Sequence, residues 1–259
     1  MNSRSDIYQP SGRFRGTGIS SRLLLASLIL VTGGTVSTIA QPSSLQAIRG
    51  EFNDGYFDRV VERAPVEIRR ARKSRDYATA SEVAVLGARS LMQLEKYDEV
   101  PQLLDDAFSD AAKVKSNSRG LAAVHFCRAA FLRTRRDFQA AADFARKAFA
   151  AVPNDRKVET EYYLNIGRIL YSAGYDLAAI IWLEKAEKLS EDNPRSAIQI
   201  EVLRYLSVTW WSKFDYAKAL NYAKKTTDIA TNSPFPFRYR LSLYDLARLL
   251  NVVGQKSKA

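Results

Sequence analysis

The sequence has very little of the chemistry on which most metal proteins depend. Among 259 residues it contains one cysteine, Cys127, and one histidine, His125. One cysteine excludes a disulfide within the chain, and one histidine with one cysteine leaves no cluster with the spacing of a metal site. We therefore predict no bound metal, and we interpret both residues as parts of helices.

Catalytic patterns are also missing from the sequence. A Ser-His-Asp arrangement would have to use His125, which stands beside Phe126 in an apolar segment, and no nucleophile elbow occurs. The carboxylate pairs Asp105-Asp106 and Glu191-Asp192 fit helix surfaces or helix ends, where solvation and the helix dipole account for them. We predict that the protein is not an enzyme and that it needs no cofactor.

Basic residues outnumber acidic ones, 39 to 28, so the formal net charge is +11. Such a charge favours acidic partners or anionic membrane surfaces. The basic residues alternate with acidic ones along the predicted helices, as on a solvated face, and no nucleic-acid module accompanies them, so we predict no nucleic-acid binding. The densest basic stretch is RRARKSR (69–75). Two interpretations of it stay open: a solvated helix end, or a contact with anionic lipid or an acidic protein.

One long apolar run, LLLASLILVTGGTVSTIA, covers residues 23–40, with four arginines before it and no charge after it until Arg49. The small residues Thr38 and Ala40 fit a cleaved export signal, whereas the length of the run just suits an uncleaved anchor in a bilayer of about 30 Å. Gly33-Gly34 disfavours a buried helix. We predict an exported protein, periplasmic or otherwise extracytoplasmic, that contacts the membrane through 23–40 if this segment is retained.

A pattern of an apolar helix, a short turn and an alanine-containing second helix recurs beyond residue 80 about every 40 residues. The turns are EKYDEV (95–100), RRDFQAAA (135–142), AGYDLAA (173–179), KFDYAKA (213–219) and VGQKSKA (253–259). A fixed period of this length indicates stacked helical hairpins, because one hairpin alone has too little core.

This pattern resembles the tetratricopeptide repeat family, with longer spacing than the family's 34 residues. A unit begun at Thr160 has the family's small residues at Gly167, Gly174, Ala179 and Ala186, and a unit begun at Ala122 has Ala129, Asp137-Phe138, Ala141, Ala148 and Pro153. The resemblance implies an all-α fold, a right-handed superhelical array of antiparallel helix hairpins with a concave face.

We predict three segments: 1–40 as the signal or anchor, 41–80 as a degenerate hairpin around GYFDRVV (55–61), and 81–259 as the repeat array. Its units start near residues 81, 122, 160, 200 and 240, and the last is incomplete. The final predicted helix, Arg240 to Gly254, has an apolar stripe of Leu243, Leu246, Ala247 and Leu250. Two interpretations stay open: the chain is the N-terminal piece of a longer protein, or this open helix docks on another chain.

Gly167 and Gly174 raise the question of a phosphate-binding loop. We predict packing instead, because no strand precedes them and the flanking apolar residues have helical spacing. Gly167 and Ala186 would let two helices approach closely, and Gly174 would end the first helix in a left-handed conformation. The predicted core residues around them are Tyr163, Ile166, Leu170, Leu183, Leu203, Leu206 and Trp210.

In the family that the sequence resembles, the first helix of each hairpin faces the binding groove. The matching positions in this chain are Arg89, Arg133, Asn165, Arg168, Tyr171, Arg204, Tyr205 and Trp211. The resemblance implies a noncatalytic scaffold that binds a protein or peptide partner, and the arginines suggest an acidic one. Arg168 and Arg204 would hold a carboxylate with Asn165 between them, while Tyr171 and Trp211 would pack against apolar parts of the ligand.

Two alternatives to this groove hypothesis stay open. The arginines could instead pair with Glu161 and Glu201 on the same helix faces, and the family's carboxylate-clamp motif is not reproduced in this sequence. The chain could also be a sensory or regulatory N-terminal module of a larger signalling protein.

Overall fold

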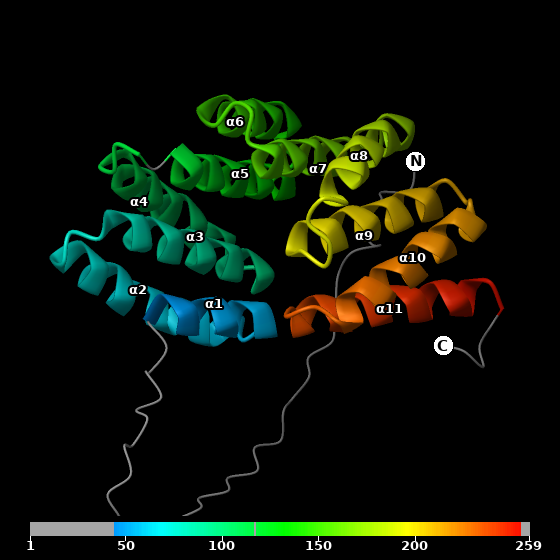
Figure 1. Cartoon of the computed structure of the whole chain (residues 1–259), viewed down its shortest axis with the longest axis horizontal. Helices are drawn as coiled ribbons and strands as arrows, with labels where there is room; N and C mark the ends of the chain where they lie inside the picture. Colours follow the sequence, from blue (N-terminus) through cyan, green and yellow to red (C-terminus); the bar gives the residue numbers. More distant parts are fainter. Residues whose placement is uncertain (1–43, 117, 255–259) are drawn as a thin grey trace, which may run out of the picture. The chain divides into compact units, whose positions relative to one another are not determined.

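The computed structural model describes residues 44–116 and 118–254, and all the regular structure in this range is helical (Figure 1). In chain order the elements are α1 (Ser44–Asp54), α2 (Phe57–Lys73), α3 (Tyr77–Gln93), the 3-10 turn η2 (Tyr97–Glu99), α4 (Val100–Ala112), α5 (Ser118–Thr134), α6 (Phe138–Ala151), α7 (Arg156–Ser172), α8 (Asp176–Ser190), α9 (Ala197–Ser212), α10 (Tyr216–Thr231) and α11 (Pro236–Val252). The predicted signal or anchor, 1–40, lies outside the described residues. Among the described helices, none has both the length and the apolar character needed to cross a membrane.

Consecutive helices pack in pairs, and each helix also packs on the next, so the molecule is an all-α array of hairpins. The helices α5, α7 and α9 begin the hairpins α5/α6, α7/α8 and α9/α10. The predicted unit starts at 122, 160 and 200 fall inside these three first helices. The predicted final helix is α11, which begins at Pro236, four residues before the expected position because proline suits the first turn of a helix.

The recurring acidic-aromatic pair has a physical explanation in the hairpin turns. The first helix ends in a Schellman motif, in which one residue has positive φ. The amide of the next residue then donates to the carbonyl five positions back in the helix, as from Asp137 to Leu132 at 3.0 Å. The carboxylate of Asp137 then caps the second helix by accepting from the amide of Ala140. Asp76 and Asp215 cap α3 and α10 in the same way. One acidic residue therefore ends one helix and starts the next.

Gly167 is a packing residue, as predicted. A Cβ atom on it would lie 2.6 Å from Cγ of Leu183, so α7 and α8 can approach this closely only if position 167 has no side chain. Ala186 is fully buried, and Gly174 has a φ of 90° at the turn. The prediction of a helix-packing segment is thus confirmed.

The core residues are in part those expected from the sequence. Leu183, Leu203 and Leu206 are fully buried, whereas Tyr163, Ile166, Leu170 and Trp210 are half-buried. In α7 the more deeply buried positions are Leu164 and Ile169. The predicted stripe of α11 is divided: Leu250 is buried, Leu246 and Ala247 are half-buried, and Leu243 is 41% exposed. Leu246 packs with Leu249 against the alanines of α10.

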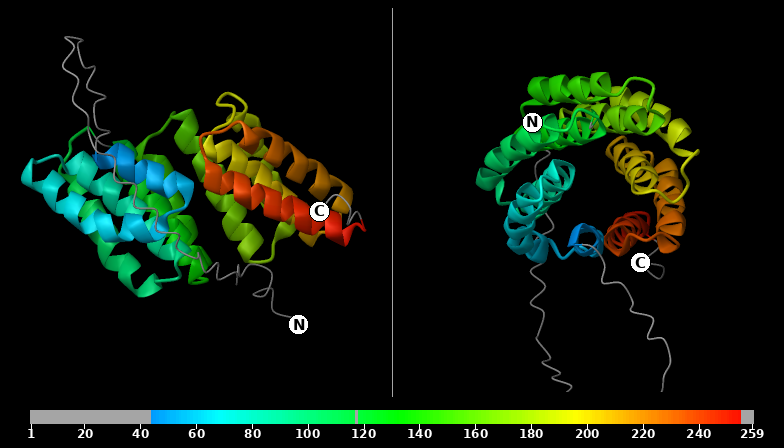
Figure 2. Two further views of the ribbon diagram at one scale, coloured as in Figure 1. Left: turned by 90° about the horizontal axis from the view of Figure 1, so that it is seen from below. Right: turned by 60° about the vertical axis from the view of Figure 1, so that its left-hand side comes forward.

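The first hairpin of the described array, α1/α2, meets the last described helix, α11. The rings of Phe57 and Phe237 lie edge to face with centroids 4.9 Å apart, and the Arg240 guanidinium donates a hydrogen bond to the carbonyl oxygen of Asp54. In the right-hand view of Figure 2, α1 and α11 lie side by side and the helices between them form a closed curve. The array formed by residues 44–254 therefore has an inside and an outside.

Candidate functional site

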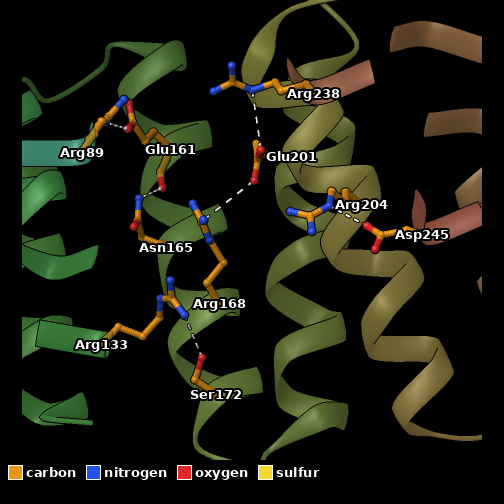
Figure 3. Close-up of polar contacts among 10 residues, drawn as sticks. All are labelled: Arg89, Arg133, Glu161, Asn165, Arg168, Ser172, Glu201, Arg204, Arg238 and Asp245. Atoms are coloured by element: carbon orange, nitrogen blue, oxygen red, sulfur yellow. Dashed lines mark hydrogen bonds and ion pairs between the residues drawn. The ribbon is translucent and has the colours of Figure 1, made fainter. Parts of the chain in front are cut away.

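The inner face of the array is formed by the odd-numbered helices from α3 to α11. Each of these helices packs on the next odd-numbered helix as well as on its neighbours in sequence. Charged side chains from four of them, α3, α7, α9 and α11, meet in ion pairs on this side of the array (Figure 3). We call this surface the inner face, and its charged residues are Arg89, Arg133, Glu161, Arg168, Glu201, Arg204, Arg238 and Asp245.

Arg89 of α3 reaches across α5 to α7. Its Nη2 lies 3.3 Å from Oε1 of Glu161, and Nδ2 of Asn165 donates to the backbone carbonyl of Glu161 at 2.8 Å. The side-chain NH₂ group of Asn165 therefore already makes a hydrogen bond within α7. Burial lowers the pKa of Arg89, but the charge of Glu161 and the contact with Cys127 together outweigh burial, so the pKa is raised overall and the guanidinium stays charged.

Arg168 of α7 and Arg238 of α11 share a single carboxylate, that of Glu201 in α9. The ion pairs measure 3.8 Å from Arg168 and 3.6 Å from Arg238, as Figure 3 shows. Burial alone would raise the pKa of Glu201, but Arg168, Arg204 and Arg238 hold it below its usual value. Glu201 is thus a carboxylate surrounded by guanidinium groups.

The pKa of Arg238 is lowered, first by burial and then by the charges of Arg89, Arg168 and Arg204, against the opposing effect of Glu201. The pKa of the Tyr205 hydroxyl is also lowered: burial would raise it, but Arg168, Arg133 and Arg204 reverse that effect. The two shifts share one contribution, the positive charge of the neighbouring arginines at the centre of the inner face.

Arg204 has a structural partner that the sequence did not suggest. Its Nε lies 2.6 Å from Oδ2 of Asp245 in α11, and both side chains are more than nine-tenths buried. A buried pair of this kind joins α9 to α11, and removal of one member would leave an unpaired charge.

The remaining predicted groove residues lie at different levels of the inner helices. Arg133 of α5 donates to Oγ of Ser172 at 3.1 Å, and Tyr171 packs edge to face on Tyr205 with centroids 6.2 Å apart. Trp211 lies towards the end of α9, where the guanidinium of Arg248 stands 4.8 Å from its ring. The assignment of these residues to ligand binding stays a prediction.

The alternative pairing with glutamates applies to two of the predicted arginines. Arg89 pairs with Glu161 and Arg168 with Glu201, whereas Arg204 pairs with Asp245. Sequence reasoning missed Arg238 and Asp245. Arg238 could have been found from its spacing in the sequence: Arg168, Arg204 and Arg238 follow one another at intervals of about one repeat.

The basic stretch RRARKSR lies at the end of α2. Arg70 is largely exposed, but Arg72 is held by Asp110 of α4, with Nε 2.7 Å from Oδ2 of a fully buried carboxylate. One of its arginines therefore belongs to the packing between hairpins, and the stretch is not a uniform basic surface.

Comparison with known proteins identifies the fold only. No protein-family model and no curated protein sequence matches this chain. The crystal structure of BtubC (BKLC) from P. vanneervenii is similar, with a TM-score of 0.58 and 16% identity over 78% of this chain and 86% of that one. PilF of Pseudomonas aeruginosa matches with a TM-score of 0.48 and 19% identity over 71% and 73% of the two chains. The tetratricopeptide-like repeats of a putative kinesin light chain from Podosopora anserina match with a TM-score of 0.46 and 14% identity over 71% and 92%. The chain has a tetratricopeptide-like repeat fold.

Proposed function

We propose that this protein is a noncatalytic scaffold that binds an acidic segment of a protein partner on its inner face. Arrays with this fold generally serve protein interaction, and their inner surface offers a continuous contact for a peptide. The observation that carries the proposal is the series of inner-face arginines, one from each of five successive odd-numbered helices: Arg89, Arg133, Arg168, Arg204 and Arg238. We also take the superhelix to be right-handed, as the resemblance implies.

Site-specific crosslinking in the producing cell tests this proposal on the full-length chain. A photoreactive phenylalanine analogue would replace Tyr171 on the inner face in one variant and Ile181 on α8 in the other. Ile181 is a suitable control because it is 56% exposed on an even-numbered helix. A partner captured from position 171 and not from 181 would support binding on the inner face. Capture from position 181 alone would contradict it.

Charge reversal gives a second test, and the geometry decides which arginine to change. Arg204→Glu would set two carboxylates against each other in the buried pair with Asp245, so loss of binding could reflect unfolding. Arg133→Glu avoids that pair, because the side chain of Arg133 contacts a serine hydroxyl instead. We expect Arg133→Glu to weaken capture of an acidic partner while the thermal midpoint changes little.

The proposed location is outside the cytoplasm, through export or anchoring by residues 23–40. This proposal rests on the sequence pattern of that segment. Amino-terminal sequencing of the mature protein tests it: a start at Gln41 indicates a cleaved signal, and an intact segment in the membrane fraction indicates an anchor. An intact chain in the soluble cytoplasm would contradict both.

A second candidate function is a sensory or regulatory module of a larger signalling protein. The observation that favours it is the exposure of Leu243 and Tyr244 on α11, at 41% and 54%, since a further helix could cover them. An antibody against the array distinguishes the two candidates. A cellular product much larger than 29.1 kDa would favour the module.

A further inference from the structure

We propose that Arg168 and Arg238 form a site for a dianionic oxyanion group, either a phosphoryl group or two adjacent carboxylates, carried by the segment that binds the inner face. The proposal rests on the proposed function, because it names the chemistry that this surface recognises. It places the anion beside Glu201, between α7 and α11.

Two guanidinium groups share one carboxylate at this site, so the positive charge is in excess. Arg168 and Arg238 approach the one carboxylate of Glu201 at 3.8 Å and 3.6 Å, distances that make ion pairs but exceed those of good hydrogen bonds. Among the described residues, Nε of Arg168 is buried without a hydrogen-bond partner, and the buried Nε of Arg238 meets Glu201 only in the 3.6 Å ion pair, without a hydrogen bond. A buried donor without an acceptor is costly, and an additional anion would supply the missing acceptors.

The neighbouring charged groups do not remove this imbalance. Arg89 and Arg204 face the same region, and each is matched by one carboxylate, from Glu161 and Asp245 respectively. Each of these pairs balances only its own charge. The second guanidinium beside Glu201 is therefore left without a matching carboxylate among these pairs.

Both guanidinium groups are held in place by aromatic rings. The guanidinium of Arg168 stands 4.5 Å from the ring of Tyr205, and that of Arg238 stands 5.3 Å from the ring of Phe235. A guanidinium fixed in this way loses little freedom when it forms paired hydrogen bonds to a phosphate or carboxylate. The side chains are 23% and 15% exposed, so a small charged group can still reach them.

Thermal unfolding of the full-length chain tests the site directly. The probes are inorganic phosphate, a tripeptide with two adjacent glutamates, and a matched tripeptide with one phosphoserine, each against sodium chloride of equal ionic strength. At about ten times the Kd, we expect phosphate to raise the Tm of the wild-type chain by about 3–6 °C beyond chloride. The two peptides distinguish a phosphoryl source from a carboxylate source.

Three variants sharpen the test. Arg238→Gln should abolish the response to phosphate while the Tm without ligand stays the same or rises, because one buried positive charge is removed; Arg168→Gln should abolish the response too. Glu201→Gln should lower the Kd for phosphate by about tenfold, since a competing negative charge disappears. Arg146→Gln is the matched control, because Arg146 is an exposed arginine of α6 that pairs only locally with Asp143, and it should respond like the wild type.

The outcomes separate this proposal from the scaffold proposal. If phosphate and both peptides act on the wild type no more than chloride does, or if Arg238→Gln responds as strongly as Arg146→Gln, the dianion site is wrong. Inner-face crosslinking that persists in that case leaves the scaffold function standing. Conversely, a phosphate response that depends on Arg238 without any crosslinked protein at position 171 would keep the anion site and overturn the protein-binding function.

Discussion

Single residues control the turns between the helices. The left-handed position of the hairpin turn is occupied by Gly174 in one hairpin, but by Arg136 and Phe214 in others, with φ of 63° and 62°. Residues with a Cβ atom pay about 1–2 kcal/mol for this conformation, whereas glycine adopts it readily. The turns that use arginine and phenylalanine are therefore locally strained, and the flanking Asp caps help to hold them in place.

This strain predicts opposite effects for two substitutions at equivalent positions in two different hairpin turns. Arg136→Gly should stabilise the protein by about 0.5 kcal/mol, because relief of the left-handed backbone exceeds the extra chain entropy that glycine brings to the unfolded state. Gly174→Ala should destabilise it by about 1–2 kcal/mol. Urea unfolding of both variants measures the two values. If both substitutions destabilise the protein, the described turn conformation does not control stability.

His125 predicts a pH dependence of stability. Its ring lies between those of Phe108 and Phe144, with centroids 5.6 Å and 5.7 Å away. Burial lowers its pKa first, and the charges of Arg128 and Lys147 lower it further. The unfolded chain, with a histidine pKa near 6.5, therefore binds more protons than the folded chain, so this stability is complete above about pH 6.5 and is lost as the pH falls towards the folded-state pKa.

Replacement of the imidazole isolates that effect. His125→Phe keeps an aromatic ring between Phe108 and Phe144 but cannot take up a proton. The free energy of unfolding should fall more steeply for the wild type than for His125→Phe as the pH is lowered from 7.5 to 5.5. Urea unfolding at several pH values measures both curves. Parallel curves would mean that His125 titrates alike in the folded and unfolded chains.

At the scale of elements, helix packing in a hairpin depends on a few small residues. Gly167→Ala should destabilise the α7/α8 hairpin by about 1–3 kcal/mol, since the added carbon would lie 2.6 Å from Leu183 and force the helices apart. Gly50→Ala in α1 is the matched control, because its added Cβ atom would meet nothing within 4 Å. We expect that control to gain about 0.5–1 kcal/mol from helix propensity. Equal effects of the two substitutions in urea unfolding would contradict the close approach.

The features that could be predicted from the sequence are those that depend on residues within one hairpin. The hairpin turns could be predicted because the Asp cap and the left-handed residue are local features, and Gly167 because its effect is local to one hairpin. The ion pairs could not, since the pairs Arg204–Asp245 and Arg238–Glu201 join different helices. Which arginine meets which carboxylate depends on the curvature of the whole array, and no spacing in the sequence encodes that curvature directly.

At the scale of the whole array, the contact between α1/α2 and α11 sets this protein apart from an open solenoid. In an open array each unit contacts only its neighbours, so the terminal helices unfold most easily. Here the carbonyl of Asp54 accepts from Arg240, and the rings of Phe57 and Phe237 pack edge to face. The two ends therefore stabilise each other and close this side of the array, which a ligand of the proposed inner-face site would have to pass.

Phe237→Ala tests this closure. Loss of the aromatic contact should increase amide hydrogen exchange in both α1 and α11 by about tenfold or more, while α7 and α8 keep their protection. The radius of gyration should rise in small-angle scattering as the ends separate. Tyr244→Ala is the control, because it removes from the same helix an exposed ring that stacks with Arg248 of α11 itself. Faster exchange in α11 alone would mean that the contact does not hold the ends together, and the inner face would then be open along its whole length.

If both ends loosen, a ligand of the proposed inner-face site should associate faster with Phe237→Ala than with the wild type. The ligand could then enter between α1 and α11 without waiting for these two helices to separate.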